Sequence, residues 1–92
     1  DAAEYSSRKE ALEVIGCIIN NPSLLDDYSL DAKDFENLVA KAIFKAVEKL
    51  HSDGSKFVDA DMIESCLDKY YPTDYRIYQK SQGINLLGQA VT

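Results

Sequence analysis

The residue best suited to acid–base chemistry in this chain is His51, its only histidine. An imidazole exchanges protons near neutral pH, but catalysis also needs a nucleophile or a carboxylate held beside it. The sequence indicates no such partner. His51 falls in the last turn of a predicted helix, where a partly positive imidazole interacts favourably with the helix dipole. We therefore expect a structural role for it and no catalytic residue in the chain.

Aspartates are the next candidates, because clustered carboxylates can bind a divalent cation. They are Asp26, Asp27, Asp31, Asp34, Asp59 and Asp61. Their spacing lacks the EF-hand pattern. Each falls where a helix is expected to begin, and negative charge stabilises a helix N-terminus. We expect capping and solvation rather than a metal site.

The two cysteines, Cys17 and Cys66, both lie in apolar stretches. This placement predicts two buried, reduced thiols rather than a disulfide. No metal-ligand spacing surrounds either residue.

Nucleotides and nucleic acids are poor ligands for this sequence. Its four glycines form no GxxxxGK[ST] run, so we expect neither ATP nor another cofactor to bind this chain. The net charge of −6 also argues against a phosphate-binding face and against adhesion to anionic membranes. We expect no direct nucleic-acid contact.

Tyrosines form the most unusual cluster of side chains. Four of the six lie within nine residues: Tyr70, Tyr71, Tyr75 and Tyr78. With few basic neighbours in the sequence they make a weak stacking platform for bases. These tyrosines could serve either in core packing or in a protein interface, and the sequence does not distinguish the two roles.

Helices must position these residues, because no regular alternation predicts a strand and four or five helical patterns can be identified. The first helix spans about residues 6–20 and stops before Pro22. A short helix carrying Leu24 and Leu25 follows, with Pro22 in its first turn. Residues 11–19 are apolar nearly all round, so we expect the first helix to be the central one of a bundle.

A second amphipathic pattern covers residues 31–54 and predicts one long helix. Apolar side chains recur at three- and four-residue steps from Phe35 to Leu50, and lysines occupy the other side. Gly54 provides a left-handed stop.

The third helix is predicted to begin after an Asp59 cap and to end at Tyr71-Pro72, with Cys66 and Tyr70 on its inner face. Tyrosines and Ile77 then suggest a short or irregular segment, followed by a last helix from about Ile84 to Val91. Five apolar residues are not needed to complete a compact three-helix core, and we therefore predict that they bind a partner. They are Tyr75, Ile77, Tyr78, Ile84 and Leu87. The substitutions Tyr78→Asp and Leu87→Asp are expected to weaken association with a partner and to leave the fold intact.

Length and composition fit one helical domain over residues 1–92, with 46% hydrophobic residues. No apolar run is long enough to span a membrane, and no leader sequence is evident. The absence of an initial Met suggests a fragment or a processed product. We expect a cytoplasmic protein.

Three stretches, taken in order, resemble the N-terminal domain of DnaB-type bacterial and phage replicative helicases. They are EALEVIGCIINNPSLLDD, LDAKDFENLVAKAIFKAVEKLHSDG and VDADMIESCL. The family pattern of an acidic and a small residue, then "vLGalL", is matched from Glu10-Ala11 to Ile19, and an aliphatic pair follows at Leu24-Leu25. Asp34-Phe35 matches the Asp-Phe step of the family. Residues 43–54 match its "IF.A...L...G" pattern, and residues 58–67 match its "iD...v...L" pattern. A glycine opening an aliphatic helix is matched by Gly83-Ile84-Asn85-Leu86-Leu87.

The resemblance implies an all-α bundle of about five to six helices in irregular, near-orthogonal packing. It also implies a C-terminal helical hairpin, which is incomplete here. Such domains form a collar on the helicase ring, associate with other subunits, and contact primase and sometimes a loader. ATP and Mg²⁺ belong to a separate motor domain, so we expect the isolated chain neither to hydrolyse ATP nor to form a stable hexamer.

Other interpretations remain open. The helicase-binding domain of primase has a similar fold, and its "LL..NP.LL" opening fits residues 18–25, although residues 34–54 favour the helicase. Two further alternatives are an unrelated helical adaptor domain and a metal- or nucleotide-dependent enzyme that uses the acidic clusters.

Overall fold

The computed structural model describes residues 8–81 and Gly88. Its elements are α1 (Arg8–Asn20), α2 (Leu24–Asp27), the 3₁₀ turn η1 (Ala32–Asp34), α3 (Leu38–Ser52), α4 (Ala60–Tyr70) and α5 (Pro72–Lys80). No strand forms within these ranges, so the all-α prediction is confirmed. The predicted last helix, which includes Ile84 and Leu87, lies outside the described residues. No helix in the described part is long and apolar enough to cross a membrane.

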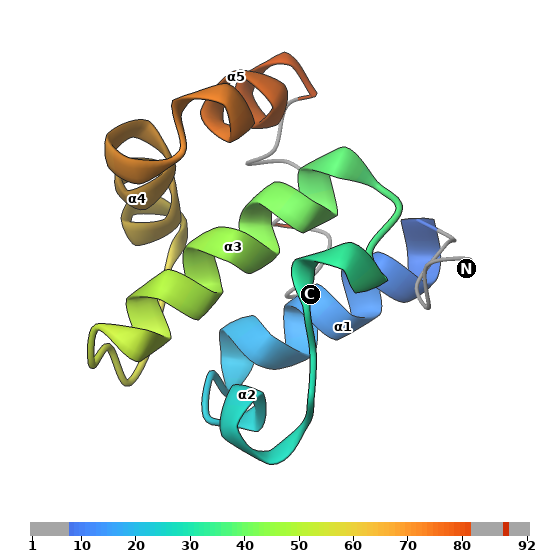
Figure 1. Cartoon of the computed structure of the whole chain (residues 1–92), viewed down its shortest axis with the longest axis vertical. Coiled ribbons are helices and arrows are strands. Elements are labelled where there is room, and N and C mark those ends of the chain that lie inside the picture. The colour runs from blue at the N-terminus through green and yellow to red at the C-terminus, as the bar shows by residue number, and fades with distance from the viewer. Residues whose placement is uncertain (1–7, 82–87, 89–92) are drawn as a thin grey trace.

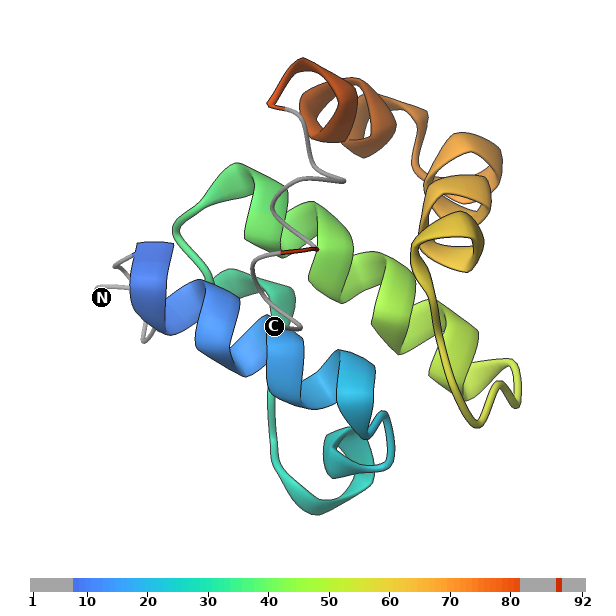
Figure 2. The same ribbon diagram turned by 180° about the vertical axis from the view of Figure 1, so that it is seen from behind.

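Helix α3 is the centre of the bundle. It packs against α1 and η1 on one side and against α4 and α5 on the other. Figures 1 and 2 show α3 running through the middle of the molecule, with α4 and α5 together at one end of the view and α1 and α2 towards the other. The expectation that α1 is central was therefore wrong, because α1 packs mainly against α3 and α2.

The core is built largely from the apolar face of α3. Ile43 and Phe44 are fully buried, and the Phe44 ring lies 5.1 Å from that of Phe35. Ile15 and Ile18 of α1 close the core from one side, and α4 and α5 close it from the other. The buried residues from the outer helices include Ile63, Cys66, Leu67 and Tyr78. The amphipathic pattern of residues 35–50 thus predicted the main core correctly.

The single long helix predicted over residues 31–54 is divided in the structure. Asp31 and Asp34 form a capping box around η1, and Phe35 is extended. Helix α3 begins only after Asn37, whose Oδ1 accepts hydrogen bonds from the backbone N–H of Val39 and Ala40, both at 3.0 Å. An asparagine side chain that satisfies these N–H groups fixes the helix start, so the apolar period alone misplaced it.

The C-terminal end of α3 follows the sequence prediction more closely. Gly54 has φ +102°, a conformation that glycine adopts without a steric cost. Asp59 caps α4 through a 2.9 Å hydrogen bond from the Met62 N–H, and α4 ends at Tyr70. Both predicted boundaries are confirmed.

Two proline-containing segments differ from the predictions. Pro72 opens a regular nine-residue helix, α5, where a short or irregular segment was expected. Proline suits this position because the first helical N–H has no partner within the helix. Pro22 lies in the turn before α2 instead of inside it, since Ser23 is the residue that precedes the first helical position.

Candidate functional site

The partner-binding residues predicted on α5 do not form one open face. Tyr78 is only 2% exposed and belongs to the core. Its hydroxyl donates a hydrogen bond to Glu64 Oε1 of α4 at 3.2 Å. Burial, reinforced by the Glu64 carboxylate, raises the pKa of Tyr78. The expectation that an Asp at Tyr78 leaves the fold intact is therefore wrong, because it would place a carboxylate in the core.

Tyr75 and Ile77 are half-buried and pack against the same core. The Tyr75 ring stacks on that of Tyr78 at a centroid distance of 6.5 Å and an interplanar angle of 16°. Each can present part of its surface to a partner while the remainder stabilises α5. The structure brings these three residues together; Ile84 and Leu87 lie outside its described part.

Lysines of α3 reach the tyrosines at the junction of α4 and α5. Lys49 Nζ lies 4.4 Å from the ring centroid of Tyr70, and Lys69 Nζ approaches the same ring at 5.2 Å. Lys45 Nζ lies 5.9 Å from the Tyr71 centroid. Distances of this order permit cation–π attraction. The sequence neighbours of these tyrosines include few basic residues, but the fold adds Lys45 and Lys49 from α3, which is more than 20 residues away in the sequence.

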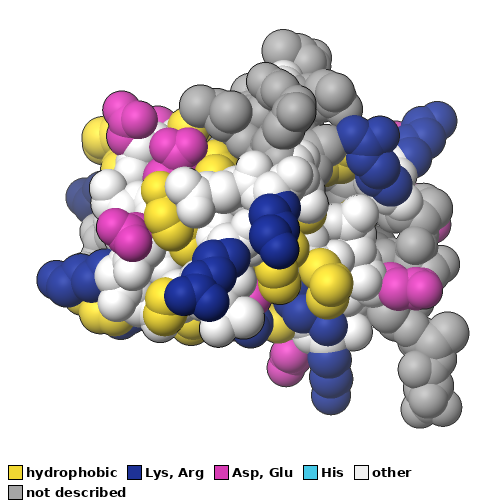
Figure 3. Space-filling model, turned by 90° about the horizontal axis from the view of Figure 1, so that it is seen from above, with side chains coloured by type: hydrophobic (Ala, Val, Ile, Leu, Met, Phe, Trp, Pro, Cys, Tyr) yellow, Lys and Arg dark blue, Asp and Glu magenta, His cyan; other side chains and the backbone are white. Residues whose placement is uncertain are grey.

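Ion pairs accompany these contacts. Lys45 pairs with Asp74 of α5 at 3.2 Å, and Lys49 pairs with Asp53 at the same distance. The Asp53 carboxylate raises the pKa of Lys49. Figure 3 shows one surface of the molecule from above, on which Lys and Arg side chains lie among hydrophobic and acidic side chains. This surface has both charge signs despite the acidic composition.

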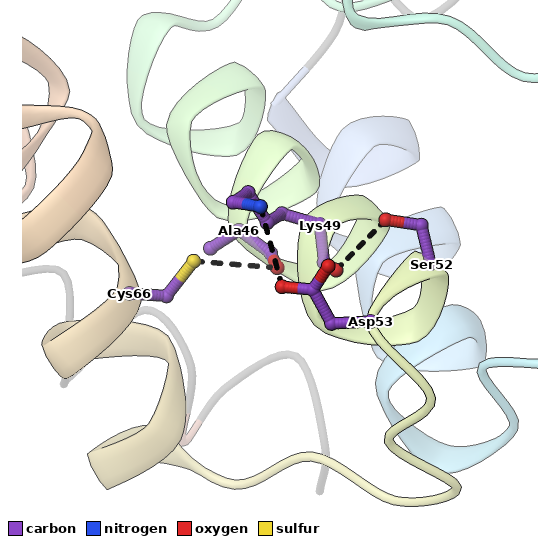
Figure 4. Close-up of polar contacts among 5 residues, drawn as sticks. All are labelled: Ala46, Lys49, Ser52, Asp53 and Cys66. Carbon is purple, nitrogen blue, oxygen red and sulfur yellow. Dashed lines mark hydrogen bonds and ion pairs between the residues drawn. The ribbon is translucent and has the colours of Figure 1, made fainter.

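The buried part of the contact between α3 and α4 is apolar and includes one weak hydrogen bond. Cys66 Sγ lies 3.8 Å from the carbonyl oxygen of Ala46, to which its thiol donates (Figure 4). Burial raises the pKa of Cys66. Beside it, the last turn of α3 is closed by the Lys49–Asp53 pair and by a hydrogen bond from Ser52 Oγ to the Lys49 carbonyl. Burial therefore favours the protonated form of this thiol.

Among the comparisons with known proteins, one gives a match. The family model of the DnaB-like helicase N-terminal domain matches residues 4–89. The chain belongs to this family. No curated protein and no solved structure gives a significant match to it. The resemblance in the order of the helical patterns is thus confirmed, and this DnaB-like N-terminal domain is assigned to a family of replicative helicases.

His51 of this DnaB-like domain pairs with α2. Its Nε2 lies 3.0 Å from Asp26 Oδ2, and its Nδ1 is buried with no partner among the described residues. The Asp26 side chain is 70% exposed, so the pair joins a solvated carboxylate to the end of α3. No local pattern in the sequence predicted this partner, which is 25 residues away.

The aspartates of the DnaB-like domain act mainly at helix starts. Asp31 and Asp59 accept hydrogen bonds from backbone N–H groups, and Asp26, Asp27, Asp34 and Asp61 lie in first turns. The capping prediction is confirmed for Asp31, Asp34 and Asp59, whose carboxylates accept backbone N–H hydrogen bonds. Within the described ranges no three His, Cys, Asp or Glu residues lie close enough together to bind a metal ion.

Several exposed apolar side chains were missed by the sequence analysis. They are Tyr28, Leu38, Phe57 and Tyr70. Tyr70 had been placed on the inner face of α4, but it is 47% exposed and lies against the lysines. Phe57 lies in the connector before α4 and is 69% exposed, and the neighbouring Lys56 and Ser55 were the only signal for a surface position.

Cys17 was also misplaced, because it is exposed while Cys66 is buried. It continues an outward stripe of α1 that includes Glu10, Glu13 and Asn20. Spacings of three and four residues put these side chains on one face of the helix. An apolar stretch therefore contains a solvent-facing cysteine, since a thiol fits either environment.

Proposed function

We propose that this chain is the N-terminal protein-interaction and ring-assembly domain of a replicative DNA helicase acting in DNA replication. In this role it supports the collar of the ring, associates with other subunits, and contacts primase and, in some systems, a helicase loader. An ATP-driven motor outside this chain unwinds the duplex. The single observation that carries the proposal is the family match over residues 4–89.

The described structure supports a binding role by its chemistry. Several ionisable side chains are engaged in structural contacts, as in the exposed pair of His51 with Asp26 and the part-buried pair of Tyr78 with Glu64. The sequence contains no P-loop for nucleotide binding. Two surfaces could contact a partner protein. One is the partly exposed apolar surface of Tyr75 and Ile77, and the other is formed by Tyr70 and the lysine beside it. We infer that the domain itself is not catalytic and needs no cofactor, whereas ATP and Mg²⁺ act in the motor.

The partner surface is proposed to centre on α5 and the segment after it. Tyr75 and Ile77 would contribute their exposed edges. Ile84 and Leu87, which lie outside the described residues, stay predicted partner contacts. Tyr78 would act from beneath, by holding Tyr75 in place through ring stacking. Its contribution would be positional, because the ring is 2% exposed.

Sequencing the complete coding region separates a helicase from a primase. A GxxxxGK[ST] motif C-terminal to these 92 residues supports the proposal. A primase catalytic domain in the same reading frame would overturn it in favour of the helicase-binding domain of primase. A reading frame with neither would favour an adaptor domain.

A further inference from the structure

A groove of about 420 Å³ lies between the last turns of α3 and one side of α4. Leu50 of α3 and Met62 of α4 line it and are both half-buried. Tyr70 lines it at the C-terminal end of α4 and is exposed. The α3–α4 groove therefore offers an apolar surface that stays accessible in the described structure.

The two ends of the α3–α4 groove have opposite charge. Asp61 and Lys69 both line it, and their separation of eight residues is about 12 Å along the axis of α4. Lys69 lies against the Tyr70 ring, and the remaining charged lining residue, Asp53, is paired with Lys49. Asp61 is exposed and forms no ion pair within the described part of the chain. The groove therefore suits an apolar group with a cation at the Asp61 end.

The chain itself contains a group of this chemistry in the connector between α3 and α4. Phe57 is 69% exposed and does not line the groove of its own copy. Lys56 beside it is exposed and has no ion-pair partner among the described residues. The Lys56-Phe57 pair thus complements the apolar surface and the acidic end of the α3–α4 groove.

The connector holds Phe57 between two fixed points. The Ser55 N–H donates a 2.9 Å hydrogen bond to the carbonyl oxygen of Leu50, and Val58 is buried in the core. Figures 1 and 2 both show this connector at an edge of the molecule, next to the start of α4. A ring presented on an anchored segment loses little conformational freedom when it binds.

A second copy of the chain is the occupant that this arrangement fits. Phe57 and Asp61 are four residues apart, so their Cα atoms are separated by at most about 14 Å. The ring and the acidic end of the groove therefore lie on neighbouring parts of one surface. A two-fold axis between them places Phe57 of each copy on the groove of the other, because such an interface is self-complementary. A nucleic-acid strand fits less well, since its phosphates would meet Asp53 and Asp61.

We propose that two copies of this chain associate by reciprocal insertion of Phe57 into the α3–α4 groove, with Lys56 of each copy paired with Asp61 of the other. The inference rests on the proposed association between subunits, and it names a surface for that association that is separate from α5.

The size of this contact predicts a weak dimer. An aromatic side chain buries about 150–250 Å². Two inserted rings and the surface that they cover therefore remain below the roughly 1,200–2,000 Å² of a stable interface. In a ring, other contacts between subunits would strengthen the pairing by raising its effective concentration.

Sedimentation equilibrium of the 92-residue chain at low ionic strength measures the association. We expect a monomer–dimer equilibrium whose dissociation constant rises by about tenfold or more in Phe57→Ala. The matched control, Tyr28→Ala, removes another exposed aromatic ring and should leave the dissociation constant unchanged. A chain that stays monomeric at millimolar concentration, species larger than a dimer, or equal effects of the two variants would overturn the proposal.

Charge reversal tests the reciprocal arrangement. Lys56→Glu and Asp61→Lys each place like charges at both contacts of a two-fold dimer, so each variant alone should associate several-fold more weakly. An equimolar mixture of the two variants should associate again, because both contacts of the mixed dimer then join opposite charges. The controls Lys33→Glu and Glu13→Lys make the same charge changes at exposed positions and should leave association unchanged. A mixture that does not associate, or equal weakening by the controls, would contradict the proposal.

Two results separate this contact from the proposed function. A monomeric chain whose reading frame has a GxxxxGK[ST] motif C-terminal to these residues rejects the contact and leaves the helicase assignment intact. A dimer with the expected response to charge reversal, in a reading frame without that motif, rejects the proposed function and leaves the contact intact.

Discussion

The hydroxyl of Tyr78 donates a hydrogen bond to Glu64, and this contact ties α5 to α4 inside the core. Because burial raises the pKa of Tyr78, the hydroxyl stays protonated and remains a donor across the physiological range. Tyr78, which the sequence suggested for partner binding, thus stabilises the packing of α5 on α4 and supports the neighbouring Tyr75.

Truncation of Tyr78 tests its place in the core. Tyr78→Phe removes the hydrogen bond and is expected to cost about 1 kcal/mol of unfolding free energy. Tyr78→Ala leaves a cavity and should cost about 3–5 kcal/mol. Urea denaturation measures both values, with Phe57→Ala at a 69% exposed position as a control that shifts stability by less than about 0.5 kcal/mol. Similar midpoints for Tyr78→Ala and the control would refute the core assignment.

The start of α3 is fixed by the Asn37 side chain. Asn37→Ala leaves the N–H groups of Val39 and Ala40 without their acceptor and should lower the unfolding free energy by about 1 kcal/mol. Ser23 occupies the matching position before α2 but makes no capping hydrogen bond. Ser23→Ala is therefore the control and should change stability by less than about 0.5 kcal/mol in thermal denaturation. An equal loss in the two variants would argue against the cap.

The two thiols should differ sharply in reactivity. Cys17 is exposed, whereas Cys66 is buried and its pKa is raised, which lowers the thiolate fraction that reacts. One equivalent of a thiol reagent should couple rapidly to the native chain, and a second only after denaturation. Cys17→Ser should abolish the fast phase and Cys66→Ser should retain it. Two fast equivalents in the native state would show that Cys66 is accessible.

Glu48 provides a pH-dependent prediction with a defined sign. Desolvation, together with the charge of Asp31, raises the pKa of Glu48 above its ordinary value of 4.5. A raised carboxyl pKa stabilises the fold below the unfolded-state value, and this contribution is lost as pH rises through the folded-state value. Glu48→Gln should therefore raise the melting temperature at pH 7 and leave it unchanged at pH 3.

The control for this experiment is Glu13→Gln, at an exposed position on α1. We expect it to leave the melting temperature unchanged at both pH values. The Glu48 gain should be modest because its side chain is also exposed. A lower melting temperature of Glu48→Gln at pH 7 would contradict the assigned direction.

The sequence predicted those features that depend on local pattern. The apolar period of α3, the Asp59 cap and the Gly54 stop each depend on neighbouring residues, and all three are found. The helix start at Asn37 was missed, because the apolar pattern continues through residues that do not form α3.

Long-range pairings could not be predicted in the same way. The contacts of Lys45 with Asp74 and of His51 with Asp26 join residues that are 29 and 25 positions apart. They depend on how helices cross, which residue spacing does not specify. Tyr78 was assigned to a surface for the same reason, since an α5 packed across α3 and α4 was not foreseen.

The most direct test of the central claim is a binding measurement with the primase of the same organism. The 92-residue chain is immobilised, and purified primase is passed over it alongside a Tyr75→Ala variant and a Phe57→Ala control. We predict saturable primase binding that Tyr75→Ala weakens and Phe57→Ala leaves unchanged. Absence of primase binding to the correctly folded chain, together with binding to a helicase collar domain, would contradict the account and indicate the primase side of the pair.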